Sequence, residues 1–145
     1  MKYTIVPDRC TELELARVLL VDDDPTSRLT LQTVLQAGGY HVDAAASAAE
    51  AVGKLDEQEY ELVLSDLQME SPEAGLKVLA HAKNMVYKPA TAIVTTYQND
   101  HHFKPLKQSR MLIKPEDVPG LLAKVANLIS ERATRRVLRE LRHAT

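Results

Sequence analysis

The chain of 145 residues has no tryptophan, one phenylalanine and a single cysteine, Cys10. One cysteine can form neither an intramolecular disulfide nor a cysteine-based zinc site. The shortage of aromatic rings argues against base stacking as a main activity. No apolar run reaches the length of a membrane span, and the first ten residues lack the apolar core of a signal peptide. We therefore expect a cytoplasmic protein in a reducing compartment, with no membrane partner.

The bulk composition is that of one globular domain. Apolar residues make up 45% of the chain and charged residues 26%, which is enough apolar material for a substantial core. The formal net charge is −2, which does not favour non-specific binding of nucleic acid by the whole body. The sequence contains no internal repeat and no low-complexity linker.

One stretch organises the rest of the chain. The apolar run at residues 18–21 leads directly into Asp22, Asp23 and Asp24, and Pro25 follows. A continuous apolar run without alternation is typical of a central strand in a parallel sheet, covered on both faces. Asp24 followed by Pro25 indicates a helix N-cap and first helical residue. That interpretation accounts for one acid only, so Asp22 and Asp23 favour a cation site over a plain turn.

Strand and helix patterns alternate along the rest of the chain. Beyond the first strand, apolar runs predict strands at 40–45, 60–66, 91–95 and 110–113. Helical spacing predicts helices from Pro25 to Gly38-Gly39, after Ser47 with Glu50 completing a capping box, around 76–82 and at 116–130, with a weaker candidate at 97–109. This alternation predicts an α/β protein with a parallel sheet and helices on both faces.

Polar side chains follow four of these strands at their carboxyl ends. Asp22 and Asp23 follow the first, Asp66 the third, Thr95 the fourth and Lys114 the fifth. In such sheets ligands bind beyond the carboxyl ends of the strands. Carboxylate oxygens suit Mg²⁺, and a carboxylate can also accept a phosphoryl group. A metal ion and an ammonium group can neutralise the oxygens of the transferred group.

Taken together, these motifs resemble the receiver domain of bacterial two-component response regulators, in the stand-alone, chemotaxis-type form. The resemblance rests on the acid pair, on Ser65-Asp66, on Thr95 and on Lys114-Pro115, and it covers residues 17–130. It implies a flavodoxin-like (βα)5 doubly wound sandwich, with a parallel five-stranded sheet in the order 2-1-3-4-5 and a long C-terminal helix.

The resemblance also implies roles for the acids. Asp66 would be the phosphoacceptor, receiving its phosphoryl group from a histidine kinase or a phosphotransfer protein. Asp23 and Asp66 would bind Mg²⁺ directly, Asp22 mostly through water, and the backbone carbonyl of Gln68 would be a further ligand.

On the same basis, Thr95 and Lys114 would bind the phosphoryl oxygens. The switched protein-interaction surface would run through strands four and five and the last helix to an unknown downstream protein. The sequence departs from the family pattern in four places. Glu70 stands where a proline is usual, the loop from Asp66 to Gly75 is one residue longer, and Met111 replaces the usual switch aromatic. The segment from Thr95 to Lys114 is also short, with an interrupted fourth helix.

Two segments flank the expected receiver domain. Residues 1–16 form an N-terminal extension of open role, and residues 131–145 form a basic helical extension with five arginines and two glutamates. We do not expect this extension to bind nucleic acid. A helix that overruns its domain with partial apolar spacing can pair with a second copy. We therefore predict a homodimer through the apolar positions Val125, Leu128, Ile129, Val137, Leu138 and Leu141.

Two other functions remain open at this stage. The first acid motif is similar to the nucleophile motif of haloacid-dehalogenase-type phosphatases, but that family needs an acidic pair well beyond its lysine. Here only Glu116 and Asp117 follow, directly after Lys114-Pro115. A non-phosphorylated pseudo-receiver is the other alternative, and the intact acids, threonine and lysine argue against it. We expect a phosphoacceptor rather than an enzyme, with at most slow self-dephosphorylation.

Overall fold

The computed structural model describes residues 16–66, 69, 71, 73–95, 110–113 and 118–144, and their side chains except at 95, 110–113, 118–119 and 143–144. Strands and helices alternate as the sequence predicts. In chain order they are β1 (Arg17–Val21), α2 (Pro25–Ala37), β2 (His41–Ala45), α3 (Ala48–Glu57), β3 (Leu62–Asp66), α4 (Ala74–Lys83), β4 (Ala90–Thr95), β5 (Arg110–Ile113) and α5 (Val118–Ala144).

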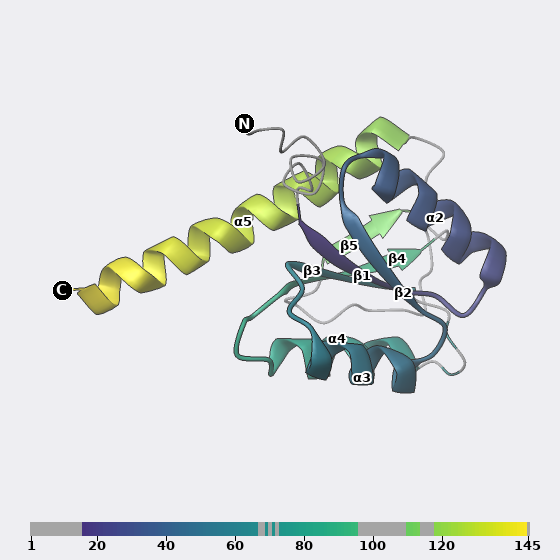
Figure 1. Cartoon of the computed structure of the whole chain (residues 1–145), viewed down its shortest axis with the longest axis horizontal. Coiled ribbons are helices and arrows are strands. Elements are labelled where there is room, and N and C mark those ends of the chain that lie inside the picture. The colour runs from purple at the N-terminus through teal and green to yellow at the C-terminus, as the bar shows by residue number, and fades with distance from the viewer. Residues whose placement is uncertain are drawn as a thin grey trace, which may run out of the picture.

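The five strands form one parallel sheet in the order β2-β1-β3-β4-β5, which confirms the predicted flavodoxin-like topology. Helices α2 and α5 cover one face of the sheet, and α3 and α4 cover the other (Figure 1). Because all strands run in the same direction, the carboxyl ends of β1, β3, β4 and β5 share one edge.

Local sequence signals explain where α2 begins and ends and where α3 begins. The Asp24 carboxylate accepts a hydrogen bond from the Ser27 backbone N–H at 2.8 Å, and α2 ends at a glycine pair whose second member, Gly39, has φ of 100°. At α3, Ser47 Oγ accepts from the Glu50 N–H at 3.1 Å. Glu50 in turn accepts from the N–H of Ala46, one residue before the position expected in a capping box.

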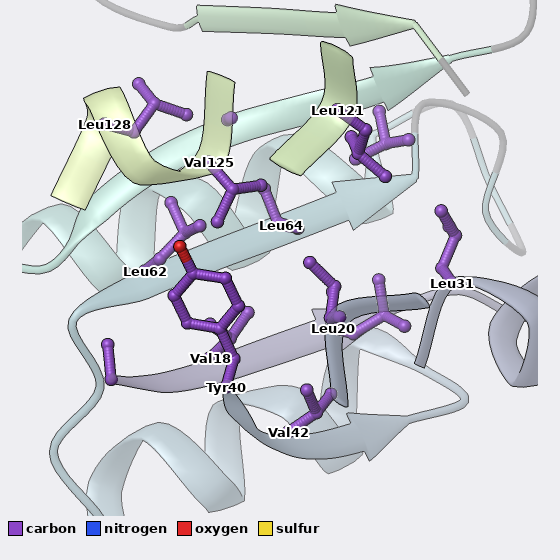
Figure 2. Close-up of a cluster of buried hydrophobic side chains, with 14 of the residues drawn as sticks. Val18, Leu20, Leu31, Tyr40, Val42, Leu62, Leu64, Leu121, Val125 and Leu128 are labelled. Carbon is purple, nitrogen blue, oxygen red and sulfur yellow. The ribbon is translucent and has the colours of Figure 1, made fainter. Parts of the chain in front are cut away.

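The core has two layers because the strand side chains alternate between the faces of the sheet. Figure 2 shows the layer under α2 and α5, where Val18 and Leu20 of β1 and Leu62 and Leu64 of β3 meet Leu121, Val125 and Leu128 of α5. The other layer contains Leu19, Val21 and Val63, packed against α3 and α4. Residues 18–21 are at most 1% exposed, so burial on both faces explains their unbroken apolar run.

The last helix is longer than the domain needs. The sequence predicts a helix at 116–130 with a basic continuation, and the structure has one uninterrupted helix, Val118–Ala144. Every helix in the described part of the chain is too short or too polar to cross a membrane. The predicted helix at 97–109 and the N-terminal extension up to residue 15 lie outside the described residues.

Candidate functional site

Three carboxylates meet at the carboxyl edge of the sheet. Asp22 and Asp23 follow β1, Asp66 ends β3, and these strands pair with Val21 opposite Ser65. The carboxylate oxygens of the three acids lie within 4.8 Å of one another. Asp22 is fully buried, Asp66 is 7% exposed and Asp23 is exposed. The cluster therefore opens to solvent on the side of Asp23.

Asp22 makes three hydrogen bonds, two through its backbone and one through its carboxylate. Its N–H donates to the Ala45 carbonyl of β2 at 3.0 Å, and its own carbonyl accepts from Arg28 Nη1 at 2.8 Å. Its side-chain Oδ1 accepts from the Asp24 N–H at 3.0 Å, which fixes the carboxylate in the turn. Arg28 belongs to no motif of the sequence, in which it is simply a basic residue in the first turns of the helix that follows the acids.

Helix α4 begins against the end of β3, and a glycine makes this approach possible. A Cβ on Gly75 would lie 2.8 Å from the Asp66 carbonyl oxygen and 3.2 Å from Ser65 Oγ. The first distance is shorter than real Cβ contacts, and a backbone carbonyl in a strand cannot swing aside as a side-chain tip can. Gly75 thus sets how closely α4 can approach the end of β3. In the sequence, Gly75 marks only the end of the loop that follows Asp66.

The backbone of Thr95 lies at the same edge as the acids. In the pairing of β3 with β4, Asp66 stands opposite Val94, and Thr95 is the next residue. Thr95 pairs in turn with Ile113, the last residue of β5, which directly precedes Lys114 in the sequence. The side chain of Thr95 and residues Gln68 and Lys114 lie outside the described part of the structure. Their predicted roles stay predictions.

The three acids are chemically suited to a hard divalent cation. One oxygen of each acid lies within 4.8 Å of those of the other two, and two unit charges at that limiting distance repel each other by roughly 3 kcal/mol at an effective dielectric constant of 20. A bound cation offsets this repulsion, and Mg²⁺ uses oxygen ligands from one or two carboxylates while keeping several waters. A cluster with two buried acids and one exposed acid provides such ligands and leaves a side open for water. The residues present therefore fit Mg²⁺.

Comparison with known proteins places these residues in a family. The model of the response regulator receiver domain matches residues 18–126. The transcriptional regulatory protein ZraR of Klebsiella oxytoca is 33% identical over 111 residues, covering 74% of this chain and 25% of ZraR. The autoinducer sensor kinase/phosphatase CqsS of Vibrio cholerae is 28% identical over 132 residues, covering 87% of this chain and 19% of CqsS. The chain thus spans about a quarter or less of these relatives.

Solved structures of response regulator proteins are also similar to this chain. The response regulator TrrA of Thermotoga maritima, in complex with Mg(2+)-BeF, has a TM-score of 0.69 and 28% identity, covering 79% of this chain and 99% of that chain. A CheY-like receiver domain protein of Methanospirillum hungatei has a TM-score of 0.72 and 27% identity, and the match covers 83% of this chain and 98% of that chain. The acids cluster at the expected edge of the sheet, and the family model matches most of the length of the chain. The chain therefore belongs to the response regulator receiver domain family.

Proposed function

We propose that the chain is the phosphoacceptor of a two-component system, taking a phosphoryl group on Asp66 in the presence of Mg²⁺. The observation that carries the proposal is the meeting of Asp66 with Asp22 and Asp23 within 4.8 Å at the carboxyl edge of the sheet. Membership of the receiver family supports phosphoryl transfer as the use of this cluster.

In the proposed reaction, a carboxylate oxygen of Asp66 attacks the phosphorus of a phosphohistidine. The O–P bond forms as the N–P bond breaks, and the imidazole nitrogen released from phosphorus is left to take up a proton. Asp66 is 7% exposed, so a donor must approach from the open side of the cluster. Asp22, Asp23, Asp66 and the Gln68 carbonyl would hold Mg²⁺, which supplies neutralisation of the phosphoryl oxygens when bound. Thr95 and Lys114 would contact the same oxygens.

The proposed donor is a histidine kinase or a phosphotransfer protein, and the setting is the cytoplasm. The output is a protein-interaction surface on β4, β5 and α5 that an unidentified downstream protein recognises, together with a homodimer through α5. The chain acts as an acceptor and not as a turnover enzyme, with slow self-dephosphorylation at most. CqsS is described as a sensor kinase/phosphatase, which supports a role in the same kind of pathway.

The test is labelling with a small acyl phosphate, followed by intact-mass measurement. With Mg²⁺ we expect the parent protein to gain one phosphoryl group and Asp66→Asn to gain none. The matched control is Asp56→Asn, which changes an exposed acid of α3 and should be labelled like the parent. Labelling of Asp66→Asn, or labelling that persists in excess chelator, contradicts the proposal. An unlabelled parent favours the pseudo-receiver alternative.

A further inference from the structure

The last turns of α5 project from the domain with apolar side chains in solvent. Figure 1 shows the C-terminal half of this helix leading away from the sheet and from the other helices. Every residue from 133 to 142 is exposed. Three of them are large and apolar: Val137 is 52% exposed, Leu138 50% and Leu141 60%. We call residues 133–144 the overhang.

The apolar side of the overhang points away from the side of α5 that packs on the sheet. Val125 and Leu128 are buried in the core. Val137 follows Leu128 by nine residues, which is about two and a half turns at 3.6 residues per turn, so it lies on the opposite side of the helix. Leu138 and Leu141 lie within about 100° of Val137 around the helix. A flat surface laid against these side chains therefore leaves the sheet on the far side of α5.

The overhang is also strongly basic. Arg135, Arg139 and Arg142 continue the side that faces the sheet, because steps of three or four residues lead to them from Leu128. With Arg136 added, the overhang has four arginines against one glutamate, a formal charge of +3. The whole chain has a net charge of −2, so the rest of the chain carries −5. The overhang thus has one apolar side and one basic side on a protein that is otherwise acidic.

The surface of an anionic bilayer matches both sides of such a helix. A basic amphipathic helix lies in the interface with its apolar side toward the acyl chains, and anionic lipids attract its charges. The helix is about 10–12 Å across, so its outer arginines stay within about one Debye length of the surface at about 0.1 M salt. An acidic protein surface that meets the arginines would leave the apolar side in water, because the two sides are opposite each other.

Hydrogen bonds from Arg132 fix the direction in which the overhang leaves the domain. The Arg132 guanidinium donates to the carbonyl of Tyr87 from Nη2 at 2.7 Å and to the carbonyl of Lys88 from Nε at 3.0 Å. The Tyr87 hydroxyl donates in turn to the Leu55 carbonyl of α3 at 3.0 Å, so the loop that holds Arg132 is itself attached to the domain. The apolar side of the overhang therefore keeps a defined direction relative to the sheet.

We propose that the overhang binds the surface of an anionic phospholipid bilayer, with Val137, Leu138 and Leu141 inserted among the lipids. The lack of a long apolar run led to the expectation of no membrane partner, but a helix that lies on a surface needs no such run. The interaction is independent of phosphoryl transfer at Asp66. A homodimer through α5 would use the same apolar side chains, so one overhang serves one of the two uses at a time.

Co-sedimentation of the full chain with lipid vesicles tests the proposal. The probe is phosphatidylcholine with about one third phosphatidylglycerol, and pure phosphatidylcholine is the uncharged comparison. Three apolar side chains give a weak attachment, so we expect half of the protein to bind at on the order of 1 mM lipid, less tightly than the roughly 10⁴ M⁻¹ of a myristoyl chain. Binding should fall about 10-fold or more on uncharged vesicles, and also at about 1 M salt, where the Debye length is about 3 Å.

A pair of matched double variants tests the apolar side. Val137→Asp with Leu141→Asp places two charges on the inserted side and should abolish binding. Val86→Asp with Leu29→Asp makes the same two exchanges at exposed residues elsewhere, which are 95% and 64% exposed, and should bind like the parent. Far-ultraviolet circular dichroism of each variant should show the parent helix content.

The charged side is tested separately. Arg135→Gln with Arg139→Gln should weaken binding to anionic vesicles about 10–30-fold and leave the weak binding to uncharged vesicles unchanged. Asp66→Asn should bind vesicles as the parent does, so that a failure of this inference and a failure of the proposed function are distinguishable.

Contrary results are equally definite. A parent that stays in the supernatant with anionic vesicles, or that binds uncharged vesicles as tightly, overturns the proposal. Undiminished binding by Val137→Asp with Leu141→Asp does the same, because the arginines alone would then account for it. A parent that sediments as a dimer and ignores vesicles assigns the apolar side of the overhang to a second copy of the chain instead.

Discussion

At the carboxyl edge of the sheet, Asp22, Asp23 and Asp66 have their carboxylates within 4.8 Å of one another. Toward the amino edge, the carboxylate of Asp43 is surrounded by partners. It accepts a hydrogen bond from the Tyr60 hydroxyl at 2.8 Å and lies 3.4 Å from both Arg17 Nη1 and His41 Nε2, which stand at the starts of β1 and β2. One end of the sheet gathers like charges, and the other surrounds an acid with complementary groups.

The pKa of Asp43 reflects these surroundings. Burial raises the pKa of this carboxyl, but the Tyr60 hydrogen bond and the charges of His41, Arg17 and Lys54 together lower it below its usual value. The acid therefore stabilises the fold in its ionised form. At the carboxyl edge the repulsion among three acids works against folding and suits a bound cation. The comparison teaches that an acid that stabilises the fold and a cluster of acids that opposes folding can lie toward opposite edges of the same sheet.

The largest effect is expected when the acid near the amino edge is neutralised. Asp43→Asn keeps the shape but removes the charge that Tyr60, Arg17 and His41 face. We expect the free energy of unfolding at pH 7, measured with urea, to fall by about 2 kcal/mol, the usual value for hydrogen bonds to a charged group.

The pH dependence of this loss has a definite sign. Because the folded pKa of Asp43 is depressed, its stabilisation is complete above the unfolded pKa of roughly 4 and is lost as the pH falls through the folded pKa. The difference between parent and Asp43→Asn should be constant above about pH 5 and shrink below about pH 4. A difference that widens in acid contradicts this account of Asp43.

A smaller loss is expected at the tight contact of the carboxyl edge. The Cβ of Gly75→Ala would press on the Asp66 carbonyl, and overpacking of this kind costs about 1–3 kcal/mol. Better helix propensity returns up to about 1 kcal/mol, so we expect a net loss of about 1 kcal/mol and slower labelling of Asp66.

The matched control for this variant is Gly53→Ala in α3, where a Cβ meets nothing within 4 Å. That change should stabilise the protein by about 0.5–1 kcal/mol and leave labelling unchanged. If the two glycine variants behave alike, the close approach of α4 to β3 has no energetic consequence.

The smallest effect should have the opposite sign to that at Asp43. Asp23→Asn removes one charge from the acid cluster, and in the absence of divalent ions it should stabilise the fold by less than about 1 kcal/mol. Mg²⁺ should raise the Tm of the parent by binding the folded state, and should raise that of Asp23→Asn much less. Glu57→Gln, an exposed acid in α3, serves as the control and should respond to Mg²⁺ as the parent does. A destabilised Asp23→Asn would remove the contrast between the two edges.

Much of the fold and part of the site could be predicted because the signals are local. The apolar run before Asp22 specifies a strand buried on both faces, and Asp24-Pro25 specifies the start of α2. The carboxyl ends of parallel strands share one edge of the sheet, which is why the sequence alone places Asp66 beside Asp22.

The remaining features depend on approaches between distant segments. The need for glycine at position 75 arises from the distance between α4 and the end of β3, which no local pattern encodes. Arg132 resembles any other arginine of a basic helix until the loop at 87–88 is brought beside it. Arg28 is only six residues from Asp22, but no sequence motif marks the hydrogen bond from its guanidinium to the Asp22 carbonyl.

The unbroken course of α5 past Arg132 has a mechanical consequence. Its first half is packed on the sheet through Leu121, Val125 and Leu128, and residues 133–144 continue about 18 Å beyond Arg132 at 1.5 Å per residue. A stiff rod held at one end is a lever arm. A rotation of about 10° in the packed half would move the tip by about 3 Å, given that length. Any small readjustment of α5 on the sheet therefore produces its largest displacement at the C-terminal end of the helix.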